Sequence, residues 1–390
     1  MLRVVLYLLA LLVCPQGFAK AFIHPGILLD KSQLDYVKHK INANKEPWLS
    51  RYLVMKNHAL AALDHQPNAK WEGLNCGGPD GAGKHDRCRH EINDARAAYT
   101  QALLWYYSED TRYAENAIQI LNAWSDDFTG QHGGYNQALQ AAWALAVWTR
   151  AAEIIRYSYP WPNRQVVQFE NMIRDRYLAD IDEYNTDCYF GNWQAVITEA
   201  KISAAVFLED SELFESAIIR YQTYFPLYFY LEKDGQLPFA LNKCQYAAKQ
   251  ARLKTYWNIQ SKYTPLVSGH TQETCRDLEH TAYGIAGYVN TAQTAHIQQR
   301  DLFVQSQERF ITALEFQASL DQPDSQLDLV CGKSVERKGG LTGTLLIAYE
   351  HYTKDHNIAM PNVKFWMDHN IELRPEGYFH YLWESLTHQR

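Results

Sequence analysis

The chain has 390 residues, of which 47% are hydrophobic and 13% aromatic, and its formal net charge is −7. This length is enough for one large domain or two ordinary ones. The acidic balance argues against a general binder of nucleic acids or polyanions, so an acidic polymer could bind only where basic groups gather in a cleft.

The first 21 residues have the pattern of a signal peptide. Arg3 supplies the positive charge, residues 4–13 form a short apolar run, and Ala19-Lys-Ala21 or Gly17-Phe-Ala19 gives the small-residue cleavage pattern. The run is too short to span a bilayer comfortably. No later segment has 18 uninterrupted apolar residues. We therefore expect a soluble, exported protein that is periplasmic or secreted, with one domain over residues 22–390.

The cysteines also indicate an exported protein. One of the seven, Cys14, lies in the leader, and the other six are Cys76, Cys88, Cys188, Cys244, Cys275 and Cys331. An even number of cysteines in an exported chain predicts disulfides. Cys76 and Cys88 flank a glycine-rich loop and are the pair most readily joined, whereas the other pairings stay open. No CxxC motif occurs, so we expect neither a metal nor another cofactor.

Apolar residues recur mostly at helical spacing, and few alternating β-branched runs compete with this pattern. The expected helices cover residues 91–107, 113–124, 138–157, 170–184, 193–208, 211–224, 276–298, 301–320 and 340–355. Short turns between helices of this length make antiparallel hairpins. The sequence therefore predicts an all-α fold, an α/α toroid or incomplete barrel.

Long loops between these helices are where a cleft would be built. They lie at residues 70–90, 128–136, 185–192, 233–244, 260–272 and 321–340. The aromatic-rich segment 361–390 either closes the ring or forms a short hairpin.

The most informative pattern lies in residues 273–283. Read as helix, Arg276, His280 and Tyr283 are at positions i, i+4 and i+7 and share one face. A cation, an imidazole and a phenol in one row could bind a carboxylate and move a proton. In the alternative interpretation, Arg276 pairs with Glu273 or Asp277, while His280 and Tyr283 are core residues. Both interpretations stay open.

Four segments resemble, in this order, the alginate lyase family of polysaccharide lyases, and together they span most of residues 75–320. They are residues 76–99 with Cys76-Gly-Gly-Pro and Asn93-Asp-Ala-Arg, 135–153 with Tyr135-Asn-Gln, 191–210 with Gly191-Asn-Trp193, and 275–303 with Cys275-Arg-Asp-Leu-Glu-His280. The resemblance implies an α/α toroid that cleaves a uronic-acid polymer, such as alginate or glucuronan, by β-elimination. The expected partner is therefore an anionic polysaccharide, with no nucleic acid and no membrane span.

The chemistry implied by the resemblance explains the residue types. Removing the C5 proton builds charge on the neighbouring carboxylate, which fixed donors must neutralise. A base takes this proton and an acid gives one to the leaving oxygen. We assign Asn192 and Arg276 to the substrate carboxylate, His280 as a second neutraliser or the base, and Tyr283 as the acid or acid/base. The family usually has a catalytic tyrosine, for which Tyr246 and Tyr135 are the reserves.

Several further residues are candidates for substrate binding. Asn136 and Gln137 could contact hydroxyls or carboxylates, or could be a helix cap and a solvated side chain. Trp143 and Trp193 could stack on sugar rings or belong to the core. Tyr246 and Lys243 lie in a basic stretch that either lines the cleft or is a solvated face.

This basic stretch is also where the chain departs from the family. Relatives commonly carry an acidic residue and then an arginine after the equivalent of residues 234–238, whereas residues 239–243 here read Phe-Ala-Leu-Asn-Lys. The identity of the uronate therefore stays open.

Two other functions compete with a lyase. A glycoside hydrolase on the same toroid needs two carboxylates that flank the scissile bond. The neighbours Asp277 and Glu279, at i and i+2, point apart on a helix. A non-catalytic polysaccharide-binding protein would keep the cleft without the chemistry.

Overall fold

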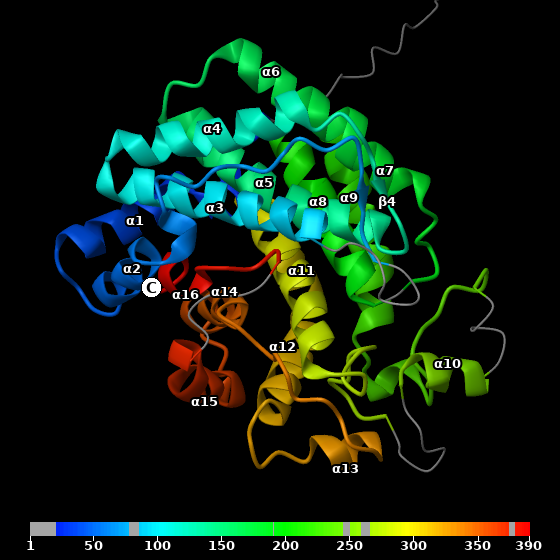
Figure 1. The fold of residues 1–390 in the computed structure, drawn as a ribbon. Coiled ribbons are helices and arrows are strands. Elements are labelled where there is room, and N and C mark those ends of the chain that lie inside the picture. The colour runs from blue at the N-terminus through cyan, green and yellow to red at the C-terminus, as the bar shows by residue number, and fades with distance from the viewer. Residues whose placement is uncertain (1–20, 78–85, 190, 245–249, 259–265, 374–378) are drawn as a thin grey trace, which may run out of the picture.

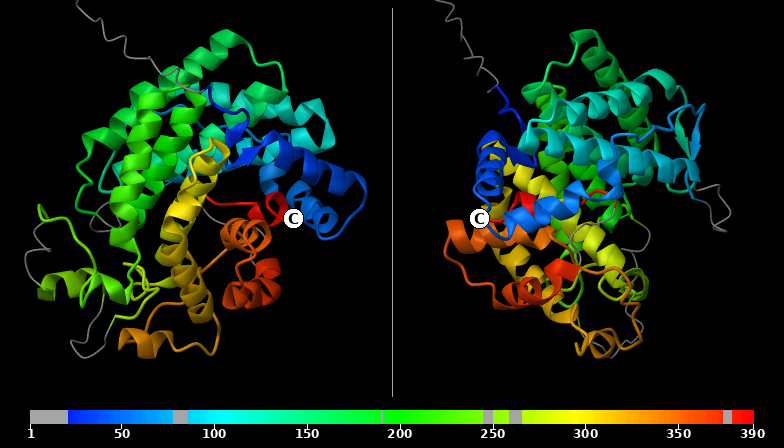
Figure 2. Two further views of the ribbon diagram at one scale, coloured as in Figure 1. Left: turned by 180° about the vertical axis from the view of Figure 1, so that it is seen from behind. Right: turned by 60° about the vertical axis from the view of Figure 1, so that its left-hand side comes forward.

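The structure is a computed structural model that describes residues 21–77, 86–189, 191–244, 250–258, 266–373 and 379–390. Over these residues it is mainly helical, and its helices form hairpins that follow one another around a curve (Figures 1 and 2). The fold is an α/α toroid, which confirms the predicted fold class.

Each hairpin consists of an inner helix and an outer helix. The inner helices are α3 (Asp86–Ser108), α5 (Gln137–Ser158), α8 (Asn192–Phe207), α11 (Leu278–Ile297) and α14 (Thr344–Tyr349). The outer helices are α4 (Thr111–Asp127), α6 (Asn163–Met172), α9 (Ser211–Tyr228), α12 (Leu302–Leu320) and α15 (Pro361–Asn370). Each inner helix packs against the inner helix of the next hairpin.

Two of the inner helices, α5 and α8, are buried on nearly all sides, and most of their residues are apolar or small. In α5 every residue from Ala138 to Ile155 is buried, and α8 is buried along its whole length. Gly287 of α11 lets α8 approach closely, since a Cβ at Gly287 would lie 2.6 Å from the carbonyl carbon of Ala195. Such close contact fixes how α8 and α11 lie side by side.

Shorter elements complete the described chain. The helices are α1 (Lys31–Asn42), α2 (Trp48–Lys56), α7 (Ala179–Glu183), α10 (Gln250–Tyr256), α13 (Leu327–Cys331) and α16 (Glu384–Thr387). Strand β1 (Gly26–Ile27) pairs with β2 (Leu29–Asp30) in antiparallel register, and β3 (Leu74–Asn75) pairs with β4 (His132–Gly133) in parallel register. π-Helical turns occur at Ile173–Leu178 and Glu350–Asp355, and 3₁₀ turns at Ala59–Ala61, Glu232–Asp234 and Ile371–Leu373.

Some helix boundaries differ from the expected ones. Helix α11 begins at Leu278 because the Asp277 side chain accepts from the backbone N–H of His280 and caps the helix. Arg276 therefore lies in the turn before α11, and the predicted helical row of Arg276, His280 and Tyr283 is wrong at its first member. The helix expected over residues 170–184 is continued from α6 to α7 by a π-helical turn.

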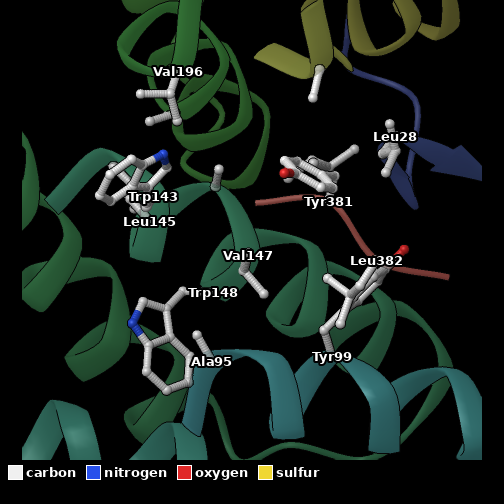
Figure 3. Close-up of a cluster of buried hydrophobic side chains, with 14 of the residues drawn as sticks. Leu28, Ala95, Tyr99, Trp143, Leu145, Val147, Trp148, Val196, Tyr381 and Leu382 are labelled. Carbon is white, nitrogen blue, oxygen red and sulfur yellow. The ribbon is translucent and has the colours of Figure 1, made fainter. Parts of the chain in front are cut away.

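The carboxyl-terminal segment closes the ring instead of forming a hairpin. Tyr381 and Leu382 lie among side chains of α3, α5 and α8 (Figure 3). The indole Nε1 of Trp383 donates to Thr100 Oγ1 of α3 at 2.8 Å. The end of the chain thereby joins the first inner helix.

Three disulfides link loops and helix ends of the described chain. They are Cys76–Cys88, which confirms the predicted pair, Cys188–Cys244 and Cys275–Cys331. In the described part of the chain no helix is both long and apolar enough to cross a bilayer.

Candidate active site

Residues from two loops meet at one end of the inner helices. Asn192 is the first residue of α8, and Glu273 lies in the loop that leads to α11. The backbone N–H of Asn192 donates to Glu273 Oε2 at 3.0 Å, and its side-chain Nδ2 donates to Glu273 Oε1 at 2.6 Å. Both side chains are buried. These bonds join the start of α8 to the turn that carries Arg276.

Arg276 has acidic neighbours and still reaches solvent. Its Nη1 lies 3.3 Å from Glu273 Oε1 and its Nε lies 3.5 Å from Asp277 Oδ2, while 44% of its side chain is exposed. The pairing considered as the alternative is therefore present, but it does not remove the guanidinium from the surface. Arg276 is held in place and remains accessible to an anionic ligand.

His280 lies beside Arg276 and is oriented by the cap of α11. Its Nδ1 is 2.8 Å from both carboxylate oxygens of Asp277, and 27% of the side chain is exposed. A carboxylate at Nδ1 fixes the imidazole and leaves Nε2 for another partner. Arg276 and His280 therefore present adjacent donors at one exposed edge of the site. We call this edge the rim of Arg276 and His280.

The carboxyl groups in this cluster have shifted pKa values in opposite directions. Burial raises the pKa of Glu273 above its ordinary value, although Arg276, His280 and Asn192 act against this rise. At Asp277 burial acts in the same direction but is outweighed by the bonds from His280, and the pKa is lowered. Asp277 is the carboxylate that stays ionised to lower pH.

Tyr283 lies one turn beyond His280 and is mostly buried, with 3% exposed. Its hydroxyl donates to Glu279 Oε1 at 2.9 Å. The centroid of its ring is 5.5 Å from that of His280 and 5.8 Å from that of Trp143. The phenol thus belongs to the same cluster, in which Glu279 is its hydrogen-bond acceptor.

The two tryptophans considered for sugar stacking are covered by other rings. Trp143 is 7% exposed and lies parallel to Phe379, with 4.0 Å between the ring centroids. Trp193 is 9% exposed and is stacked on Tyr189 at 4.9 Å. Both indoles are therefore parts of packed aromatic clusters. These clusters lie beside the group of Asn192, Arg276, His280 and Tyr283, which we call the polar centre.

A more accessible aromatic ring, that of Tyr135, lies at the edge of the cluster that contains Trp193. Tyr135 is 51% exposed, and its ring centroid is 6.0 Å from that of Trp193 in an edge-to-face arrangement. Burial and a hydrogen bond with Tyr189 raise the pKa of Tyr135, whereas the positive charge of Arg276 opposes the rise. We call Tyr135 and Tyr189 the aromatic rim.

The remaining candidates lie apart from this centre or outside the described residues. Asn136 precedes α5 without a side-chain capping bond. Gln137 donates to the carbonyl of Asp180 and to Glu183, each at 3.3 Å, which ties it to α7. Lys243 forms an ion pair with Asp187. Tyr246 lies outside the described residues.

Two features of the site were missed by reasoning from the sequence. Glu273 was considered only as a partner of Arg276, because a loop carboxylate has no periodicity that shows what it binds. Phe379 and His380 come from the far end of the chain, and no motif indicates them. The Nδ1 of His380 lies 2.6 Å from Glu199 Oε2, which anchors Phe379 next to Trp143.

Cavities elsewhere in the molecule do not involve the polar centre. One of about 320 Å³ is lined by residues of α9 and α12, including Tyr221 and Arg309. Another of about 500 Å³ lies beside Phe22 and Phe214. Among the described residues no group of three or more potential ligands has the arrangement of a metal site.

Comparisons with known proteins agree with the geometry. A family model described as alginate lyase matches residues 31–323. No curated protein matches the chain.

Solved structures share the fold at low sequence identity. Alginate lyase A1-III from Sphingomonas species A1 is 13% identical with a TM-score of 0.57, and the match covers 92% of this chain and 94% of that one. A variant of A1-III complexed with a tetrasaccharide has a TM-score of 0.58 at 14% identity, with the same coverage. An alginate lyase from Bacteroides ovatus has a TM-score of 0.57 at 13% identity, covering 88% of this chain and 96% of that one.

Proposed function

Because the chain belongs to the alginate lyase family, and is therefore a polysaccharide lyase that acts on uronate polymers, we propose that the polar centre around Asn192, Arg276, His280 and Tyr283 carries out the β-elimination. The observation that carries this proposal is the shared rim of Arg276 and His280. Both are oriented by buried or half-buried carboxylates and both keep exposed surface.

In the proposed reaction the uronate carboxylate binds at this rim. Arg276 and His280 donate to it, together with the N–H of the Asn192 amide that Glu273 does not use. These donors stabilise the charge that develops as the C5 proton leaves, and such stabilisation usually lowers the barrier more than any other effect in an active site. Their orientation before the substrate arrives reduces the cost of reorganisation in the transition state.

Tyr283 is the proposed acid/base. The C5–H and C4–O4 bonds break and a C4=C5 double bond forms. Tyr283 first passes its own proton to Glu279, whose Oε1 accepts from the hydroxyl. The resulting phenolate accepts the C5 proton, and the phenol so formed returns a proton to the leaving oxygen. The proton held by Glu279 then goes back to Tyr283.

The aromatic rim is the proposed stacking surface for a sugar ring. Trp143 and Trp193 are covered, whereas Tyr135 is half exposed and lies near Arg276. Aromatic side chains bury large areas against the apolar faces of sugars. In this proposal the covered indole of Trp193 supports the aromatic rim from behind.

Incubation with a panel of polymannuronate, polyguluronate and glucuronan tests the proposed function. We expect ultraviolet absorbance to rise with at least one polymer and product masses to match unsaturated uronate ends. Products without the double bond would instead indicate hydrolysis, and an intact polymer with measurable binding would indicate a binding protein. The same panel identifies the preferred uronate.

We also propose that the protein is exported. The leader-like pattern of residues 1–21 supports this, as do the three disulfides, which persist mainly in oxidising compartments. Mass spectrometry of the native protein should give an amino terminus near residue 20 or 22. Retention of residues 1–19 would contradict the proposal.

A further inference from the structure

We propose that Glu273 is a positioning residue of the lyase reaction, which holds the Asn192 amide and the Arg276 guanidinium in the orientation that binds the substrate carboxylate. This inference rests on the proposed function of the same centre. It assigns a role to a buried side chain that acts through the groups bonded to it.

The geometry places Glu273 beneath Arg276, the most exposed group of the polar centre. Its side chain is 2% exposed, whereas that of Arg276 is 44% exposed. It accepts from the backbone N–H and the side-chain Nδ2 of Asn192, from Arg276 Nη1 and, at 3.3 Å, from the hydroxyl of Tyr228. The carboxylate therefore joins the start of α8, the end of α9 and the turn before α11.

The chemistry of these bonds suits positioning. An ionised carboxylate is an acceptor only, and two oxygens offer about four lone-pair directions. Bonds to an ionised group are shorter and stronger than neutral ones, so they hold their donors more rigidly. A buried carboxylate that lost these donors would be strongly destabilised. The donors and the acceptor thus fix one another.

The bonds also determine what is left of Asn192 for a ligand. Glu273 uses one N–H of the amide, and the second N–H remains. The Oδ1 atom of Asn192 is buried and has no hydrogen-bond partner among the described residues. Buried polar atoms are normally satisfied, so this oxygen is an acceptor that the bonds between Asn192 and Glu273 leave unused. Glu273 fixes the amide with this oxygen turned away from itself.

Gly191 offers an independent way to disturb Glu273 without changing its chemistry. A Cβ at Gly191 would lie 2.9 Å from Glu273 Oε1 and 2.6 Å from Gln272 Oε1. The backbone at Gly191 has a φ of −77°, which alanine adopts easily. Gly191→Ala should therefore displace the carboxylate by contact alone.

The test compares Glu273→Gln with a matched buried carboxylate that forms no hydrogen bond to Asn192, Arg276, His280 or Tyr283. Glu91 of α3 is fully buried and accepts from His132, Gln140 and Tyr177. We expect Glu273→Gln to lower kcat at least about 100-fold, as the loss of an oriented donor does, with KM changed much less. Glu91→Gln should lower the melting temperature while kcat stays near that of the wild type.

A double variant separates positioning from a general structural role. If Glu273 acts through Asn192 and Arg276, then Glu273→Gln should lower kcat by a clearly smaller factor in Asn192→Ala than in the wild type, because groups that act as a unit are not additive. The inference would be overturned if the losses in kcat of the two single variants multiplied in the double variant. It would also be overturned if the kcat of Glu273→Gln were near that of the wild type.

An inactive wild type and a Glu273→Gln variant that does not fold have different consequences. A wild-type protein that cleaves no polymer of the panel would refute the proposed function itself, before any variant is compared. If Glu273→Gln does not fold, Gly191→Ala decides the question in its place. It should then lower kcat at least about tenfold with little change in KM, and unchanged kinetics in that variant would overturn the inference.

Discussion

At the scale of single residues, Arg276 depends on the shape of its guanidinium as well as on its charge. Its Nη1 and Nε contact two different carboxylates while the rest of the group faces outward. Lysine carries the same charge on a flexible stem without this planar fork. A lysine at this position would keep attraction to the polymer but lose the fixed orientation.

We therefore expect Arg276→Lys to lower kcat about 100-fold and Arg276→Ala to lower kcat/KM further, by about 1000-fold, in line with the loss of one transition-state donor. Steady-state kinetics at constant ionic strength measures both. The melting temperature should change little, because the side chain is 44% exposed and Glu273 keeps both bonds from Asn192. Equal kinetics for the lysine variant and the wild type would show that charge alone suffices.

Tyr283 gives the sharpest prediction at this scale. Tyr283→Phe keeps the ring contacts with His280, Trp143 and Phe379. It removes only the hydroxyl, which donates a hydrogen bond to Glu279. Loss of a general acid or base typically costs about 10²–10⁴-fold in rate, so kcat should fall by this amount while the circular dichroism spectrum is unchanged. Near-normal turnover would transfer the role to Tyr135 or Tyr246.

The aromatic rim should affect binding more than turnover. Removing the half-exposed ring in Tyr135→Ala should raise KM for polymer about tenfold, which corresponds to about 1 kcal/mol or slightly more for one aromatic contact. Tyr135→Phe is the control, because it keeps the ring and loses only the hydroxyl that interacts with Tyr189. A large fall in kcat for Tyr135→Phe would instead indicate a chemical role.

At the scale of elements, the disulfides lie next to the loops that carry the site. Cys275 immediately precedes Arg276 and is bonded to Cys331 at the end of α13, while Cys188 lies four residues before Asn192 and is bonded to Cys244. The carbonyl of Cys76 accepts from the backbone N–H of Asn136 at 2.9 Å. These loops are thus fixed at their ends by covalent bonds as well as by packing.

Removing the Cys275–Cys331 bond with paired serine substitutions should loosen the turn that holds Arg276. A disulfide typically contributes about 2–4 kcal/mol to stability, so the midpoint of urea unfolding should decrease. We expect kcat/KM to fall at temperatures at which the variant is still folded. An unchanged kcat/KM there would mean that Glu273 and Asp277 position Arg276 without the disulfide.

The helices of the toroid were more predictable from the sequence than the site was. Helices such as α4, α5, α8 and α9 show apolar spacing strong enough to give their type and approximate ends. Helices α1, α2 and α15 were not expected. They are short, with 12, 9 and 10 residues, although the buried residues Leu34, Val37 and Ile41 of α1 follow helical spacing. The start of α11 depends on whether Asp277 caps the helix or belongs to it, and only the position of the His280 backbone N–H decides this.

The site combines residues whose contacts do not follow from spacing. Asn192 and Glu273 are 81 residues apart and form the shortest bond of the polar centre. Phe379 reaches Trp143 only because the chain end returns through the ring. The residue types indicated uronate chemistry, but which of them would be exposed and which would be covered depended on packing between distant elements.

At the scale of the whole molecule, the ring is held by a polar cluster in its interior. Arg150 of α5 pairs with Glu199 of α8, which also accepts from Asn290 Nδ2 of α11 at 3.2 Å and contacts His380 Nδ1 at 2.6 Å. Glu384 is buried nearby, and its Oε1 accepts from the backbone N–H of Leu382 at 2.8 Å. Three successive inner helices and the chain end thus share one network.

Burial raises the pKa of Glu384 to about 7, although Arg150 acts against the rise. A carboxyl group with a raised pKa in the folded state stabilises the fold below its ordinary pKa, and this contribution is lost as the pH rises from about 4.5 to about 7. Glu384→Gln keeps an acceptor for Leu382 and cannot ionise. The stability of the wild type relative to this variant should fall by about 3 kcal/mol between pH 4 and pH 8.

Urea unfolding of both proteins across this range measures the difference directly. Glu315→Gln is the control. The Glu315 carboxylate accepts from backbone N–H groups at the start of α15 at 2.9 and 3.0 Å. A pH-independent difference between the wild type and Glu384→Gln would mean that Glu384 ionises normally inside the ring.

The position of Phe379–Trp383 has a consequence for how the enzyme is made. Residues 379–383 are synthesised after all the inner helices, and they cover Trp143, contact Glu199 and bond to α3. Toroid helices synthesised earlier lack this closing segment until residues 379–383 have left the ribosome. Products that terminate before residue 379 should therefore be inactive.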